Sequence, residues 1–129
     1  MARRCRILII DDQPDHVATL AVLLRGDGHE VEYATNPLYA IGLAQEFHPE
    51  FVFLDIGLPY MSGYDVMARL RQQFKAARII AITGRGGEDE RAKALHAGFD
   101  EYLVKPVEID VIERLLEAYT ERDRTDAGR

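Results

Sequence analysis

The chain has 129 residues, of which 47% are hydrophobic and 29% are charged, and its formal net charge is −6. This composition predicts one globular domain with a full core, and the acidic balance argues against direct binding of nucleic acid. The single cysteine, Cys5, excludes an internal disulfide and a zinc site built from several cysteines. The sequence contains no secretion signal and no apolar run of membrane-spanning length, so we expect a cytoplasmic protein without membrane insertion.

Short apolar runs alternate with amphipathic segments along the chain. We expect strands over residues 6–10, 30–34, 51–54, 78–82 and 101–104. A helix should follow each strand, starting near Pro14, Pro37, Gly63, Glu88 and Ile109. This alternation predicts an α/β fold, a doubly wound parallel sheet with helices on both faces.

Two finer expectations concern the second helix and the end of the chain. Asn36 and Pro37 have the residue types of an N-cap and a first helical position. Leu38 and Ile41 are expected to face inward from that helix. The domain should cover residues 1–120, and residues 121–129 should form a polar, flexible tail.

Four of the predicted strands end in polar residues. Asp11 and Asp12 follow the first strand, Asp55 ends the third, Thr83 ends the fourth and Lys105 follows the fifth. Because crossovers are right-handed, parallel strands end on one edge of the sheet, where such folds bind ligands. Taken one at a time, these residues could simply start helices or turns. Together they place three carboxylates, a hydroxyl and a lysine at one edge.

That combination favours a particular chemistry. Three neighbouring carboxylates repel one another unless a cation lies among them, and hard oxygen ligands are those that Mg²⁺ prefers. A lysine and a hydroxyl on adjacent strands are the groups that the oxygens of a transferred phosphoryl group require. The edge therefore indicates phosphoryl chemistry at a divalent cation.

At this point the chain resembles the receiver domain of two-component response regulators, from Arg6 to about Tyr119. The matching motifs are Ile10-Asp11-Asp12, Leu54 to Pro59 with Met61 and Gly63, Ala81 to Gly84, Ala97 to Asp100, and Tyr102 to Pro106. Each motif alone is weak, but their order and their positions at strand ends make the resemblance specific. It implies a flavodoxin-like (βα)5 sandwich with strand order 2-1-3-4-5.

The resemblance also implies roles for individual residues. Asp55 would be the phosphoacceptor. Mg²⁺, with Mn²⁺ as an alternative, would be held by Asp12 and Asp55, by Asp11 through a water and by the backbone carbonyl of Gly57. Lys105 would pair with the phosphoryl group.

Further implied roles concern the phosphoryl group and the transmission of the signal. Thr83 would donate its hydroxyl to the phosphoryl group, as would the backbone N–H of Gly84, and the Lys105–Pro106 bond would be cis. Thr83 and Tyr102 would form the switch, in which Tyr102 turns inward. The altered surface would be the fourth helix, fifth strand and fifth helix, with the members Arg91, Leu95, Tyr102 and Val104.

Two positions are expected to set the lifetime of the phosphoryl group. Gly57 has no side chain that would keep water from the acyl phosphate, whereas Arg85 is long enough to shield the group or bind its oxygens. Among the histidines, His16 lies one helical turn after Asp12 and could approach the metal edge, but we expect a solvated helix position for it. The other three histidines, His29, His48 and His96, have no partner in the sequence that suggests a site.

The resulting functional prediction is a phosphoacceptor in a two-component system or phosphorelay. The donor would be a histidine kinase or a histidine phosphotransfer protein, and the output would be contact with a downstream protein. We expect no enzymatic activity beyond self-phosphorylation from a donor and autodephosphorylation.

Several alternatives remain open. The chain could be the receiver piece of a hybrid histidine kinase, although Met1 and the polar tail favour a small complete protein. An aspartyl-nucleophile phosphatase would have a second acid where Gly57 stands. A flavodoxin-like cofactor binder would have a glycine- and hydroxyl-rich loop where Asp11 to Pro14 lie.

Overall fold

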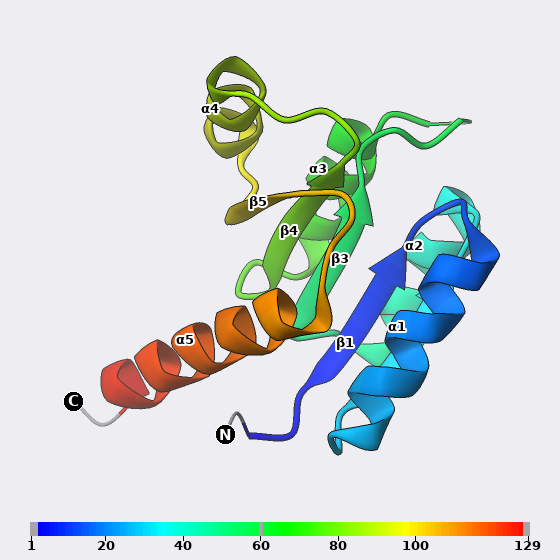
Figure 1. Cartoon of the computed structure of the whole chain (residues 1–129). Helices are drawn as coiled ribbons and strands as arrows, with labels where there is room; N and C mark the ends of the chain where they lie inside the picture. Colours follow the sequence, from blue (N-terminus) through cyan, green and yellow to red (C-terminus); the bar gives the residue numbers. More distant parts are fainter. Residues whose placement is uncertain (1–2, 60, 128–129) are drawn as a thin grey trace.

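The fold is given by a computed structural model that describes residues 3–59 and 61–127, with side chains up to residue 122. Strands and helices alternate as β1 (Arg6–Ile10), α1 (Pro14–Gly26), β2 (Glu30–Ala34), α2 (Pro37–Phe47), β3 (Phe51–Asp55), α3 (Gly63–Gln73), β4 (Arg78–Thr83), α4 (Glu88–Ala97), β5 (Glu101–Val104) and α5 (Ile109–Ala127). The strands form one parallel sheet in the order β2-β1-β3-β4-β5 (Figure 1). The predicted doubly wound α/β fold and its strand order are confirmed.

The sheet is buried on both faces. Helices α1 and α5 cover one face, and α2, α3 and α4 pack on the other (Figure 1). Within β3, Phe51 and Phe53 contact the first layer, whereas Val52 and Leu54 contact the second. Every residue of β3 is buried, which explains why its sequence is a continuous apolar run that ends in a buried acid.

Helix α2 differs from the prediction in the residues that face the sheet. Its N-cap is Asn36, as predicted, whose side chain accepts two backbone N–H groups of the first turn. However, Leu38 is 65% exposed, so its predicted inward position is wrong, and the buried helix positions include Ala40 and Ala44. Ile41 is partly buried against the core. Small alanine side chains let the helix backbone approach the sheet, which leaves Leu38 outside the contact.

The last helix reaches further than the sequence indicated. Helix α5 continues to Ala127, so most of the segment predicted as a polar tail is helical, and residues 128–129 lie outside the described part. The flexibility of this segment stays a prediction. Across residues 3–59 and 61–127, no helix has both the length and the apolar character needed to cross a membrane.

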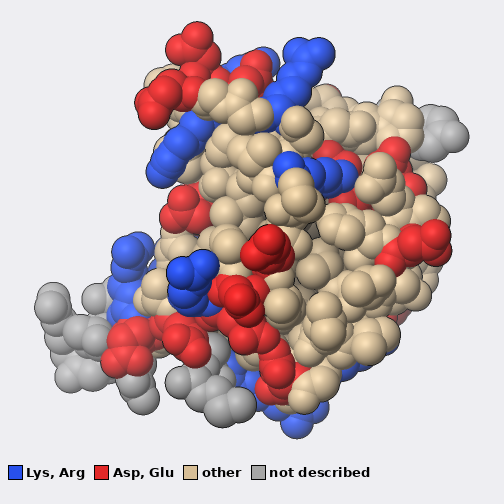
Figure 2. Space-filling view, viewed as in Figure 1, with Lys and Arg blue, Asp and Glu red and all other residues tan. Residues whose placement is uncertain are grey.

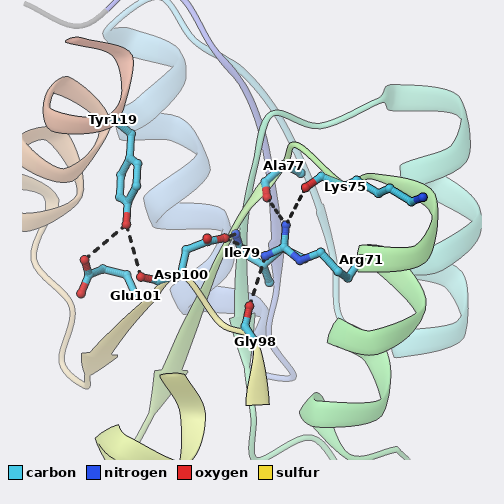
Figure 3. A network of polar contacts seen from close by, with 8 residues as sticks. All are labelled: Arg71, Lys75, Ala77, Ile79, Gly98, Asp100, Glu101 and Tyr119. Atoms are coloured by element: carbon cyan, nitrogen blue, oxygen red, sulfur yellow. Dashed lines mark hydrogen bonds and ion pairs between the residues drawn. The ribbon is translucent and has the colours of Figure 1, made fainter. Parts of the chain in front are cut away.

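A polar network joins α3, α5 and the starts of β4 and β5 (Figure 3). The Arg71 guanidinium forms an ion pair with Asp100 Oδ2 at 2.7 Å, and the same oxygen accepts the Ile79 N–H at 2.8 Å. Tyr119 donates its hydroxyl to the Asp100 carbonyl oxygen at 3.2 Å. Arg71 also donates to three carbonyl oxygens, those of Lys75, Ala77 and Gly98. This network explains the acid in the Ala97 to Asp100 motif as a structural residue.

Replacing Asp100 should therefore destabilise the fold. Asp100→Ala leaves Arg71 without its ion pair and the Ile79 N–H without its acceptor. We expect the free energy of unfolding, measured by urea titration, to fall by about 1–3 kcal/mol. The matched control is Glu46→Ala on exposed α2 surface, which should change it by less than about 0.5 kcal/mol. Equal losses in the two variants would contradict this role of Asp100.

His29 is a buried structural histidine next to β1. The backbone N–H of Cys5 donates to His29 Nδ1 at 3.1 Å, which requires an unprotonated nitrogen. Burial lowers the pKa of His29 below its ordinary value of 6.5, and the nearby charge of Asp27 opposes this only in part.

This lowered pKa predicts a pH dependence of stability. Below about pH 6.5 the unfolded chain binds a proton at this position before the folded chain does, so the folded state loses stability as the pH falls. We expect the urea midpoint to drop more between pH 7.5 and pH 5.5 in the wild type than in His29→Gln, whose side chain does not titrate. An equal drop in both proteins would show that His29 does not contribute.

Candidate functional site

The carboxyl ends of β1, β3, β4 and β5 bring the polar residues to one edge of the sheet. Asp55, the last residue of β3, lies in register with Ile82 of β4, and Thr83 follows Ile82 directly. Thr83 in turn pairs with Val104 of β5, and Lys105 comes next. The Lys105 backbone N–H donates to the Thr83 carbonyl oxygen at 2.8 Å, which extends the ladder to the lysine.

Three carboxylates meet at this edge. Asp11, Asp12 and Asp55 each have a carboxylate oxygen within 4.8 Å of the others. Asp11 and Asp55 are 2% and 5% exposed, whereas Asp12 is open to solvent. Closely spaced carboxylates of this kind fit a hard divalent cation, which prefers oxygen ligands and keeps several waters. The donor set therefore fits the predicted magnesium site.

Lys105 lies between the two buried acids. Its Nζ is 3.0 Å from Asp55 Oδ2 and 3.2 Å from Asp11 Oδ2. Burial alone would lower the pKa of Lys105, but its hydrogen bonds to both carboxylates and their negative charge outweigh this and raise the pKa above its ordinary value. The lysine is therefore charged at neutral pH. The peptide bond between Lys105 and Pro106 is cis, as expected.

Backbone N–H groups orient the two buried carboxylates. The Gly57 N–H donates to Asp55 Oδ1 at 2.8 Å, and the Gln13 N–H donates to Asp11 Oδ1 at 3.0 Å. In each acid the other oxygen, Oδ2, faces Lys105. The loop after β3 packs closely against the start of α3. A Cβ at Gly63 would lie 2.4 Å from the Ile56 Cα, so a larger residue does not fit at this position.

Thr83 and Tyr102 both bond to the backbone of Arg85. The Arg85 N–H donates to Thr83 Oγ1 at 3.1 Å, and the Tyr102 hydroxyl donates to the Arg85 carbonyl oxygen. Tyr102 is 9% exposed, so its ring already points inward in this structure. The backbone of one residue, Arg85, therefore links the two predicted switch residues through its N–H and its carbonyl group. The sequence could not reveal this link, because the backbone of any residue at position 85 could make it.

The remaining predicted residues lie around this edge and on the neighbouring surface. Gly84 and the Arg85 side chain are exposed in the loop before α4. Of the predicted signalling surface, Arg91, Leu95 and Val104 are exposed whereas Tyr102 is buried, and the role of this surface stays a prediction. Gly57 is exposed beside Asp55, and a role for its carbonyl oxygen stays a prediction.

His16 lies between the two positions that the sequence allowed. Its side chain is 31% exposed, as at a solvated helix position, but its Nδ1 is buried and lies 3.7 Å from Asp11 Oδ2, beside the acidic edge. The signal was its position one turn after Asp12. The direction of the side chain depends on how α1 leaves β1, and hydrophobic spacing does not determine that angle.

Comparison with known proteins gives one consistent result. Residues 7–117 match the response regulator receiver domain. The transcriptional regulatory protein TcrA of Mycobacterium tuberculosis is 34% identical over 91% of this chain and 46% of its own length. The sensor histidine kinase RcsC of Escherichia coli is 33% identical over 92% of this chain and 12% of its own length. The chain thus spans less than half the length of these two relatives.

A solved structure supports the same family. It is a response regulator protein from Burkholderia pseudomallei with a phosphorylated aspartic acid, a calcium ion and citrate. It superimposes with a TM-score of 0.81 and 30% identity, covering 95% of this chain and 72% of the other. The match over residues 7–117, together with the shared fold and the acidic edge, shows that this chain belongs to the response regulator receiver domain family.

Proposed function

We propose that the chain accepts a phosphoryl group from a phosphohistidine onto Asp55. The observation that carries this proposal is the placement of Asp55 at the end of β3, with the Lys105 ammonium 3.0 Å from one of its oxygens and two other acids beside it. The donor would be a histidine kinase or a histidine phosphotransfer protein. A receiver within a hybrid histidine kinase, acting as a phosphorelay intermediate, would use the same site.

The three acids would hold a divalent cation, Mg²⁺ or alternatively Mn²⁺. Asp11, Asp12 and Asp55 supply carboxylate oxygens within 4.8 Å of one another, and the Gly57 carbonyl would add a further oxygen. When bound, the cation would offset the negative charge that gathers on the oxygens of the phosphoryl group.

The residues of the chain would position and neutralise the reacting groups. A carboxylate oxygen of Asp55 forms the new O–P bond while the P–N bond to the donor histidine breaks, and the donor imidazole keeps the electron pair. The Gly57 N–H fixes the rotation of the carboxylate. Lys105 pairs with the phosphoryl oxygens, and the Thr83 hydroxyl and the Gly84 N–H donate to them. Attack by water later releases phosphate and restores Asp55, which would be the extent of the activity.

The backbone of Arg85 would carry the signal away from the site. Thr83 now accepts the Arg85 N–H, so a move of Thr83 toward the phosphoryl group would break that bond. The loop before α4 would then shift, together with the Arg85 carbonyl that holds Tyr102. Because Tyr102 already points inward, we infer that the change begins in the loop rather than with the ring. Phosphorylation thus shifts a population between two arrangements of α4, β5 and α5.

The output would be contact with a downstream protein. Acidic side chains gather over α5 (Figure 2), where Asp110, Glu113 and Glu117 line a shallow pocket together with Arg114. An acidic surface of this kind repels the phosphates of nucleic acid, so this face would not bind DNA or RNA directly.

The most direct test of the proposal uses a small phosphodonor. Incubation with acetyl phosphate and Mg²⁺ should add one phosphoryl mass to the intact protein, and Asp55→Asn should remove this adduct because no carboxylate remains to attack. The matched control is Asp65→Asn, an exposed acid on α3 that should keep the adduct. An unmodified wild type, or an adduct that persists in Asp55→Asn, would contradict the proposal.

A second prediction concerns the lifetime of the phosphoryl group. Arg85 is exposed in the loop after β4, and in this proposal its side chain would bind the phosphoryl oxygens. Losing one exposed ion pair worth about 0.5–1 kcal/mol should speed the loss of phosphate roughly two- to fivefold in Arg85→Ala. The decay of phosphorylated protein after removal of the donor measures this rate. Arg69→Ala, on exposed α3 surface, is the control, and identical decay in the two variants would rule out a role for Arg85.

A further inference from the structure

A cleft opens at the amino ends of the strands, away from the acidic edge. Arg6 begins β1, Phe51 begins β3 and Ala77 precedes β4, and all three residues line this cleft. In Figure 1 it lies where the arrows of the paired strands β1 and β3 begin. Its volume of about 410 Å³ is within the range of small-molecule sites. The roles assigned to the acidic edge use none of its residues.

Two cations in this cleft have no acidic partner. The Arg6 guanidinium donates from Nε to the His48 carbonyl oxygen at 2.8 Å, and its two terminal nitrogens have no hydrogen bond to any residue that the structure describes. The Lys75 ammonium likewise forms no ion pair with a described side chain. In a chain with a formal net charge of −6, the cleft is therefore a place where positive charge is left uncompensated.

Glu50 also lines the cleft, but its charge is already offset. Its Oε2 pairs with the Arg3 guanidinium at 2.8 Å, and its Oε1 accepts the Arg6 backbone N–H at 3.0 Å. Both carboxylate oxygens are thus occupied, and the charges of Arg6 and Lys75 remain. A cleft lined by an excess of one charge attracts ions of the opposite charge.

Aromatic side chains form part of the cleft wall. His48 follows α2 in the left-handed region, with a φ of 54°, and its ring meets the Phe74 ring edge to face, with the centroids 6.0 Å apart. Phe74 is half-buried, and the buried residues Pro49 and Phe51 line the cleft with it. A flat apolar body packs well against such rings. The cleft thus combines an apolar wall with two free cations.

We propose that this cleft binds a small aromatic molecule with a phosphate group, the class to which nucleoside monophosphates belong. The aromatic ring packs against Phe74 and His48, and the phosphate oxygens pair with the Arg6 guanidinium and the Lys75 ammonium. Two cations match the double charge of a phosphate monoester better than the single charge of a carboxylate, and a guanidinium binds phosphate oxygens in pairs. This site is separate from Asp55, so the inference does not depend on the proposed function.

An ordinary solvated surface makes a different prediction. If the cations only attract anions diffusely, the loss of any exposed positive charge should weaken the anion to a similar extent. The aromatic part of the ligand would then add nothing to the affinity. A localised, saturable response that needs both the ring and the phosphate therefore separates a binding site from a charged surface.

The test is a titration of the full chain with phenyl phosphate, followed in backbone amide NMR spectra without divalent cation or phosphodonor. A ligand of this size should bind with a Kd in about the millimolar range. We expect saturable shifts at the amides of Phe51, Lys75 and Ala77, which line the cleft, and none at those of Gly57 and Gly84 near the acidic edge. Phenol and inorganic phosphate should each bind at least about fivefold more weakly, and benzoate about two- to fivefold more weakly.

Charge variants locate the anion. Arg6→Gln and Lys75→Gln should each weaken phenyl phosphate about two- to fivefold, and the double variant should weaken it about fourfold or more, because each removes one ion pair with the phosphate. The matched control is Arg69→Gln, which removes the same charge from exposed α3 surface and should change the Kd by less than about 1.5-fold.

Any of three results would overturn the inference. The cleft amides could fail to shift or shift without saturation, the control variant could weaken binding as much as Arg6→Gln, or phenol or inorganic phosphate could bind as tightly as phenyl phosphate. None of these results bears on phosphorylation of Asp55, which is measured separately by intact mass.

Discussion

The ammonium group of Lys105 holds two buried carboxylates in one place. Asp11 and Asp55 are almost fully withdrawn from water, and Lys105 contacts an oxygen of each. Burying two like charges this close is unfavourable unless a cation and hydrogen bonds offset the loss of water. Lys105 supplies the charge, and the Gln13 and Gly57 N–H groups supply hydrogen bonds to the other oxygens. The arrangement requires the ends of β1, β3 and β5 to meet.

The two ends of the strands differ in the polar groups that they carry. Near the starts of β4 and β5, the ion pair between Arg71 and Asp100 is joined to backbone hydrogen bonds that tie four segments together. At the opposite edge the strands end in charged groups whose spacing leaves a place for a cation. Among the hydrogen bonds described above, those that attach the loop after β4 to this second edge are made by the backbone N–H and carbonyl groups of Arg85. In the proposed switch, a rearrangement at the site would therefore move the loop without disturbing the core.

The fold was predictable because buried parallel strands are short continuous apolar runs, and β3 is an example in which all residues are buried. The acidic edge was predictable because parallel strands end together, which brought Asp11, Asp12 and Asp55 into one cluster. Side-chain directions were harder to predict. Leu38 is exposed because the alanines of α2 face the sheet, and the partly exposed His16 has its Nδ1 beside Asp11. Such details depend on packing between elements, which sequence periodicity does not encode.

The identity of the phosphorylated residue can be read directly from the covalent product. An acyl phosphate is reduced by borohydride to a primary alcohol, which converts the modified aspartate to homoserine and leaves free carboxylates unchanged. Phosphorylated protein should therefore yield homoserine at position 55, located by tandem mass spectrometry of the peptide that contains β3. Homoserine at Asp11 or Asp12, or an unchanged Asp55 in protein that had gained a phosphoryl mass, would contradict the assignment of Asp55 as the phosphoacceptor.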